Sequence, residues 1–96
     1  MRTIRRSNQF KKDYKRETKG RSSTYAQKLD AELAAVLHVL MVDGTLEPRY
    51  RDHPLLNEWK DRPHCHVRPD LVLIYRKPDD SSLELVRLGS HSELGL

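Results

Sequence analysis

"LVLIYR", Leu71–Arg76, is the stretch that decides the predicted fold. A strand with one face in water alternates apolar and polar side chains, so this unbroken apolar run predicts a central strand buried on both faces. Residues 78–82, "PDDSS", have the composition of a turn. Leu83–Ser90, "LELVRLGS", predicts the strand after that turn, and "HCHV" at 64–67 predicts a shorter strand before it. Because the three strands are close in sequence, we expect an antiparallel meander.

The first residues of the chain predict a short strand and a helix. "RTIRR" at 2–6 is long enough for one strand. Ser7 or Asn8 can cap a helix over residues 8–19, and Gly20 is placed to end it.

A second helix is predicted over residues 23–42, where apolar side chains recur every three or four positions. Thr24 and Gln27 have capping-box spacing at its start, and Gly44 follows its end. We therefore predict an α+β fold, a single domain over residues 1–96 with the element order β-α-α-β-β-β. Its small antiparallel sheet carries the two N-terminal helices packed on one face.

The composition is that of a small globular domain with a polar surface. The 96 residues suffice for one modest core. Cys65 is the only cysteine, so an internal disulfide framework is excluded. No apolar stretch reaches the roughly 18 residues of a transmembrane helix, and the N-terminal "MRTIRRSNQF" lacks the apolar run of a secretory signal. We expect a cytoplasmic protein with no membrane contact.

The charge is unevenly distributed along the chain. Residues 1–28 hold ten Lys or Arg and two Asp or Glu, a net of +8, and residues 29–96 hold eight and twelve, a net of −4, which together give the formal +4. On the first helix, at about 100° per residue, basic side chains share one face and two aromatic side chains share the other with two carboxylates. The basic face comprises Lys11, Lys12, Lys15, Arg16 and Lys19, and the opposite face comprises Phe10, Asp13, Tyr14 and Glu17. This stripe predicts a surface for nucleic acid or an acidic protein partner, and a solvated helix without a partner is the alternative.

Residues 62–70, "RPHCHVRPD", concentrate side chains that bind metals or move protons. His64-Cys65-His66 is too compact for the usual structural zinc pattern, and strand alternation turns Cys65 away from both histidines. A metalloenzyme site would need the two histidines to share a metal with a third ligand from elsewhere in the chain, such as His53 or His91.

A metal-free acid–base site of the kind that cuts RNA is the second interpretation. Cleavage needs a base for the ribose 2′-OH, a cation for the scissile phosphate and an acid for the departing 5′ oxygen. Histidine takes both protonation states near neutral pH, and the candidate catalytic residues are His53, His66, Asp70 and His91. Arg87 can bind a phosphate through two N–H groups, and by strand parity it shares a side with His91 if the last strand reaches that far.

Each of these residues also has a purely structural interpretation. His53 could order a turn, Asp70 could accept backbone hydrogen bonds in a turn, and His91 could cap a terminal turn. Arg87 could form an ion pair with Glu84 or Asp70. The residue types alone leave both interpretations open, and only their joint occurrence favours catalysis.

Five motifs, in this order and spacing, together resemble the YafQ branch of the RelE-like bacterial toxins over nearly the whole chain. They are "FKKDYKR" at 10–16, "YRDHPL" at 50–55, "WK" at 59–60, "CHVRPDLVLIY" at 65–75 and "LVRLGSHSEL" at 85–94. The resemblance implies the fold predicted above. It also implies a ribosome-dependent endoribonuclease, an mRNA interferase that cuts the codon in the ribosomal A site and needs no metal or other cofactor.

The resemblance implies three kinds of partner. A cognate antitoxin encoded beside the chain binds it and blocks its activity. Such antitoxins usually have a ribbon-helix-helix part, so that operator DNA is bound through the complex. Ribosomal RNA and mRNA are the remaining partners. The basic stripe of the first helix, together with Arg21, suits ribosomal RNA, and an acidic antitoxin segment could cover the same stripe.

The resemblance also carries roles onto single residues. The histidine of the DHPL motif of the family falls on His53, and the histidine of its CH motif falls on His66. The aspartate of the PD motif falls on Asp70, and the histidine of the GSHS motif falls on His91. In the family these groups are proposed to share the acid and base work, with the arginine at Arg87 on phosphate.

Two positions depart from the pattern of the family. Leu71 and Gly95 stand where the family often has aromatic residues, which are suited to stacking on an mRNA base. Their absence motivates an alternative function, in which a catalytically weakened member acts mainly as an antitoxin-binding corepressor.

Overall fold

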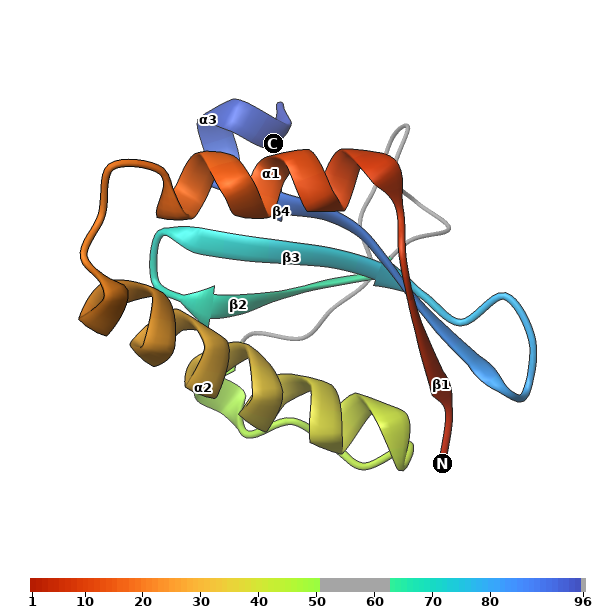
Figure 1. Ribbon diagram of the computed structural model, residues 1–96. Helices are drawn as coiled ribbons and strands as arrows, with labels where there is room; N and C mark the ends of the chain where they lie inside the picture. Colours follow the sequence, from red (N-terminus) through yellow and green to blue (C-terminus); the bar gives the residue numbers. More distant parts are fainter. Residues whose placement is uncertain (51–62, 96) are drawn as a thin grey trace.

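The structure, a computed structural model, describes residues 1–50 and 63–95. The described part of the chain forms eight elements (Figure 1), which agree with the predicted order and add a short 3-10 helix and a last helical turn. They are β1 (Thr3–Arg6), α1 (Asn8–Thr18), α2 (Ser23–Met41), the 3-10 helix η1 (Pro48–Tyr50), β2 (His64–Arg68), β3 (Leu71–Arg76), β4 (Ser82–Gly89) and α3 (His91–Leu94).

The four strands form one sheet in the order β1-β4-β3-β2. The three C-terminal strands make the predicted antiparallel meander, and the α+β fold is confirmed. β1 adds a parallel pair with β4, which the sequence pattern did not include. β3 lies between two neighbours and buries its first five residues, as its unbroken apolar run predicted.

Helices α1 and α2 cover one face of the sheet (Figure 1). The main core joins apolar side chains of these helices to those of β2, β3 and β4 and to Leu46. It contains Phe10, Leu29, Leu33, Val36, Leu40, Leu46, Cys65, Val67, Leu71, Leu73, Tyr75, Leu83, Leu85 and Leu88. Each of these large side chains contributes about 1.5–3 kcal/mol when fully buried. A smaller cluster of Val72, Ile74 and Leu94 lies on the opposite face, where Val86 packs against it. No helix in the described ranges has the length and apolar character needed to cross a bilayer.

A serine side chain caps the start of each of the two long helices. Ser7 caps α1, as predicted, and its hydroxyl accepts the Phe10 N–H at 2.9 Å. The predicted Thr24 capping box is wrong, because α2 begins at Ser23, as expected, and its cap lies two residues before Thr24. Ser22 has the extended backbone of a cap and accepts the Tyr25 N–H at 3.1 Å.

Polar side chains of α1 continue the edge of β4 where β1 ends. β1 pairs with β4 only as far as Leu85, and beyond it the Ser7 hydroxyl donates to the Val86 carbonyl at 2.8 Å. Asp13 then accepts the Leu88 N–H at 3.0 Å, and Arg16 donates to the Leu88 carbonyl at 2.8 Å. The end of β4 is therefore held by α1, and α3 follows directly from that end.

Candidate active site

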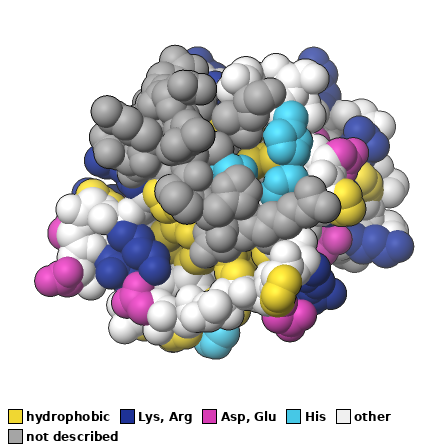
Figure 2. All heavy atoms as spheres, turned by 180° about the vertical axis from the view of Figure 1, so that it is seen from behind, with side chains coloured by type: hydrophobic (Ala, Val, Ile, Leu, Met, Phe, Trp, Pro, Cys, Tyr) yellow, Lys and Arg dark blue, Asp and Glu magenta, His cyan; other side chains and the backbone are white. Residues whose placement is uncertain are grey.

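Three histidine rings form a row on the face of the sheet opposite α1 and α2. His64 is paired with Ile74 and His66 with Val72, so these histidines share the face of the smaller apolar cluster, whereas Cys65 lies in the main core. The ring centroids of His64 and His66 are 6.0 Å apart, and those of His66 and His91 are 4.9 Å apart. Histidine side chains are seen close together on this side of the molecule (Figure 2).

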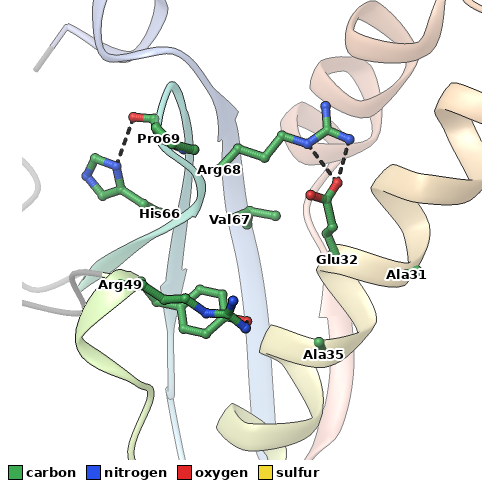
Figure 3. A pocket seen from close by; sticks show the side chains of 9 residues that line it. Ala31, Glu32, Ala35, Arg49, His66, Val67, Arg68 and Pro69 are labelled. Atoms are coloured by element: carbon green, nitrogen blue, oxygen red, sulfur yellow. Dashed lines mark hydrogen bonds and ion pairs between the residues drawn. The ribbon is translucent and has the colours of Figure 1, made fainter.

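His66 is held in one orientation. Its side chain is 5% exposed, and Nδ1 lies 3.2 Å from the carbonyl oxygen of Pro69, toward which the ring points (Figure 3). A carbonyl oxygen can only accept, so Nδ1 carries the proton of this hydrogen bond. In the neutral ring the lone pair is then on Nε2, as a general base requires.

His91 is the first residue of α3 and is exposed. Ser90, not His91, caps the helix, and it forms a capping box with Glu93. The cap places the exposed His91 ring beside the buried His66 ring, so the pair combines an enclosed imidazole with one open to solvent.

Asp70 lies in the turn between β2 and β3 and is exposed. It borders a cavity of about 440 Å³ together with Ser90 and Glu93, which lie on either side of His91 in the sequence. Asp70 and the cap of α3 therefore line the same cavity, whereas His66 lines a different one.

Arg87 is engaged by a carboxylate on α1. Its Nε and Nη2 donate to Asp13 at 2.8 and 3.3 Å, so the expected ion pairs with Glu84 or Asp70 are replaced by one with Asp13. The strand parity that would place Arg87 beside His91 does not apply, because β4 ends at Gly89. Burial opposes ionisation of Asp13, but hydrogen bonds from Arg87, the Leu88 N–H and Gln9 outweigh it and hold the pKa of Asp13 below its ordinary value.

The basic face of α1 divides into two kinds of residue. Lys11, Lys12, Lys15 and Lys19 are exposed, as predicted. The guanidinium of Arg16 instead contacts three carboxylates, those of Asp13, Glu17 and Glu93. The position of Asp13 on the aromatic face of the helix was the signal in the sequence for a buried carboxylate that needs a cation partner.

A second cavity, of about 450 Å³, opens along the outer edge of β2 between α2 and η1. Figure 3 shows His66 on one side of it and the ion pair of Arg68 with Glu32 on the other, with an Nε–Oε1 distance of 2.7 Å. The Arg49 guanidinium stacks 4.8 Å from the Tyr50 ring centroid at its lower end. His66 is therefore one of the residues that line this cavity.

The remaining predictions concern His53, Trp59, Leu71 and Gly95. His53, and Trp59 in the WK motif, lie outside the described residues. Leu71 is 4% exposed in the main core, on the face away from the histidines. Gly95 has a φ of 72° and ends α3, a conformation that an aromatic residue would adopt only under strain.

The described side chains form no group suited to a metal ion. Among residues 1–50 and 63–95, no three or more His, Cys, Asp or Glu side chains are grouped so that they could hold one. The metalloenzyme hypothesis with His64, His66 and His91 as the three ligands is therefore not supported by the positions of these residues.

Comparisons with known proteins agree over almost the entire chain. The sequence model of the family described as "Bacterial toxin of type II toxin-antitoxin system, YafQ" matches residues 2–95. The mRNA interferase toxin YafQ of Escherichia coli strain B / BL21-DE3 is 37% identical over 95 residues, covering 97% of this chain and 95% of the relative. The putative toxin YafQ of Haemophilus influenzae is 34% identical over 71 residues, covering 71% and 70%.

Solved structures give the same result. A metal-bound toxin from Helicobacter pylori is 45% identical and has a TM-score of 0.79, covering 98% of this chain and 99% of the other. The Escherichia coli toxin in the DinJ-YafQ toxin-antitoxin complex is 32% identical with a TM-score of 0.75, covering 97% and 96%. The family match over residues 2–95 and these relatives show that the chain belongs to the YafQ family of bacterial toxins from type II toxin–antitoxin systems.

Proposed function

We propose that the chain is the toxin of a type II toxin–antitoxin system and an endoribonuclease that cuts mRNA in the ribosomal A site. Its family membership and its relatives, which are named mRNA interferase toxins, support the toxin class and the RNA-cutting activity. The observation that carries the chemistry is the 4.9 Å separation of the His66 and His91 rings. Two imidazoles at that distance can both reach the oxygens of one phosphodiester.

The proposed reaction is an attack of the ribose 2′ oxygen on the neighbouring phosphorus. His66 removes the 2′-OH proton through Nε2, the P–O5′ bond breaks, and His91 donates a proton to the departing 5′ oxygen. The products are a 2′,3′-cyclic phosphate and a 5′-hydroxyl end, and no metal takes part. His53 and Asp70 are further candidates for the same proton transfers, and they were predicted from the sequence motifs.

Arg87 is proposed to stabilise the charge on the scissile phosphate. A guanidinium has five N–H donors, and Asp13 engages two of them, so three remain for phosphate oxygens. The pairing with Asp13 also restricts the rotamers of Arg87, which reduces the entropy lost when phosphate binds.

The exposed lysines of α1 are proposed to contact ribosomal RNA. Lys11, Lys12, Lys15 and Lys19 carry positive charge into solvent, and such contacts release counterions and weaken steeply with salt. A ribosomal target would place the chain in the cytoplasm.

The proposed partner that blocks activity is a cognate antitoxin with a ribbon-helix-helix part and an acidic segment. The complex of the Escherichia coli relative with DinJ supports an antitoxin partner, and the ribbon-helix-helix part and the acidic segment rest on the family resemblance. Operator DNA is bound through that complex.

The test is primer extension on a defined mRNA, with and without ribosomes carrying it. Cuts within the A-site codon that appear only with ribosomes support the proposal, and equal cutting of free RNA contradicts the dependence on ribosomes. A chelator selective for transition metals is added in parallel, because ribosomes need Mg²⁺. Cleavage that the chelator abolishes would favour a metal site, in line with the metal-bound Helicobacter pylori structure. A chain that cuts nothing in either assay but represses with its antitoxin would favour the corepressor alternative.

A further inference from the structure

The helix that carries His91 is too short to hold its own position. α3 comprises the four residues His91–Leu94, and a single helical turn is not stable in water without tertiary contacts. Leu94 packs into the smaller apolar cluster with Val72 and Ile74 and anchors one side of the turn. The start of the turn, where His91 lies, needs contacts of its own.

Those contacts come from Arg16 on α1. Its Nε lies 3.0 Å from Glu93 Oε2, and its Nη2 donates to the carbonyl of Leu88 at 2.8 Å. Nη1 donates to the buried Asp13 carboxylate at 2.9 Å. One planar guanidinium therefore joins α1, the end of β4 and α3, which a single lysine ammonium could not do with the same geometry.

Glu93 connects Arg16 to Ser90, the residue before His91. Its Oε1 accepts the Ser90 N–H at 2.9 Å, and the Ser90 hydroxyl accepts the Glu93 N–H at 3.1 Å. The hydrogen bond from the Ser90 N–H is the main reason why the pKa of Glu93 lies below its usual value, and Arg16 lowers it further. Glu93 is thus held ionised between Arg16 and the cap of α3.

Gly89 leaves the space that this arrangement needs. A Cβ at position 89 would lie 2.9 Å from Arg16 Nη2 and 3.3 Å from Glu93 Oε1. Both distances are shorter than ordinary van der Waals contact, so the side chains of Arg16 and Glu93 meet above a residue that has none.

We propose that Arg16 and Glu93 are positioning residues, which hold α3 against the end of β4 and keep His91 beside His66. The inference rests on the proposed acid–base role of these two histidines. It gives Arg16 a role different from that of the exposed lysines on the same helix. Arg16 sets the geometry of the site, whereas the lysines contribute charge toward RNA.

The cleavage test separates geometry from charge. Single-turnover rates on ribosomes programmed with one A-site codon are measured over a range of toxin concentrations for Arg16→Gln, Glu93→Gln and the control Lys15→Gln. We expect Arg16→Gln and Glu93→Gln to lower the maximal rate about 10-fold or more, with the half-saturating concentration nearly unchanged. Lys15→Gln should instead raise the half-saturating concentration and reduce the salt slope by about 1.

One further variant, Arg16→Lys, refines the result, and Glu93→Gln guards against a folding defect. Arg16→Lys keeps the charge without the planar fork, so it should keep the half-saturating concentration and still lose maximal rate. Glu93→Gln keeps an oxygen for the Ser90 N–H while removing the charge that binds Arg16. Because Glu93 is a surface residue of the last helix, this variant tests the pair even if Arg16→Gln does not fold.

An NMR comparison tests the same claim without cleavage. In the purified chain, we expect a cross-relaxation peak between the rings of His66 and His91 and slow exchange of the Leu94 and Gly95 amides. Arg16→Gln and Glu93→Gln should lose both signals, and Lys15→Gln should keep them. Variants that keep both signals, or an Arg16→Gln that behaves like Lys15→Gln in the cleavage assay, would overturn the proposal. If the unmodified chain cleaves nothing, the proposed function fails instead, and the NMR result alone decides whether Arg16 holds His91 in place.

Discussion

The imidazoles of His66 and His91 lie with ring centroids 4.9 Å apart, although His66 belongs to the edge strand β2 and His91 begins α3. Strand alternation buries Cys65 under the helices and turns His66 to the opposite face. Leu94 packs on the apolar residues of β3 on that same face and brings α3 with it. The histidine pair therefore depends on how the last turn of the chain packs.

Asp13→Asn should destabilise the fold. The buried carboxylate accepts hydrogen bonds from Arg87, Arg16 and the Leu88 N–H. The substitution takes the negative partner from Arg87 and removes one of the three carboxylates that contact Arg16. We expect a loss of about 3 kcal/mol in the free energy of unfolding, measured by urea denaturation followed by circular dichroism. Asp80→Asn, at an exposed turn position, is the control and should change stability by less than about 0.5 kcal/mol. Equal midpoints for the two variants would contradict the role of Asp13.

Stability should fall in acid, partly through Asp13. The pKa of Asp13 is lowered in the folded chain, because its hydrogen bonds outweigh the effect of burial. A lowered folded pKa means that this stabilisation is complete above the unfolded value, about 3.9 for Asp, and is lost as the pH falls below it through the folded pKa. Urea midpoints at pH 7, 4 and 3 measure the loss. Asp43 and Asp79 have lowered pKa values too. The slope of the urea midpoint against pH should therefore be smaller in Asp13→Asn than in the unmodified chain, but not zero. An unchanged slope in that variant would count against Asp13 as a contributor.

Gly89→Ala should lower the cleavage rate more than the stability. The new Cβ would lie 2.9 Å from Arg16 Nη2, which is the end of a flexible side chain, so the guanidinium can move away at a cost of about 1 kcal/mol or less. Moving it breaks the contacts with Leu88 and Glu93. We expect a fall in maximal rate similar to that of Arg16→Gln.

Gly20→Ala is the matched control for that variant. Gly20 has a φ of 73°, and a Cβ at this position would meet nothing within 4 Å, so alanine there strains the backbone by about 1 kcal/mol and touches no side chain. It should lower the unfolding midpoint and leave the maximal rate unchanged. An unchanged maximal rate in Gly89→Ala together with a lowered maximal rate in Gly20→Ala would refute the assigned role of Gly89.

Leu71→Phe should not restore a base-stacking residue. Leu71 is buried in the core beneath the helices, so a larger ring there overpacks the core by about 1–3 kcal/mol. We expect a lower unfolding midpoint and an unchanged pattern of cut codons in primer extension. A new codon preference with unchanged stability would show that position 71 reaches the RNA.

The strands and helices were predictable wherever a local pattern carries them. The apolar run Leu71–Arg76 gave β3 with its observed bounds, because burial on both faces leaves no polar position in the run. Pairing of β1 with β4 was not predictable, because four residues with one apolar anchor do not specify a partner. The helix α3 was missed, although Ser90 and Glu93 stand at capping-box spacing.

The site was predictable in its residue types but not in its contacts. His66 and His91 were named from their motifs, and the structure places them together. The partner of Arg87 was sought among neighbours in sequence and on adjacent strands, but Asp13 lies on α1, which meets β4 only through tertiary packing. The same packing removes Arg16 from the set of freely exposed cations.

The most direct test of the central claim is the saturating single-turnover rate of A-site cleavage for His66→Gln and His91→Gln. His38→Gln, on the exposed side of α2, is the control. The account predicts losses of about 10²–10⁴-fold for the first two variants and the unmodified rate for the control. The unfolding midpoints of the exposed His91 and His38 variants should be unchanged, and the buried His66 variant should have a lower midpoint but remain folded at the assay temperature. Full activity of a folded His66→Gln or His91→Gln chain would contradict it.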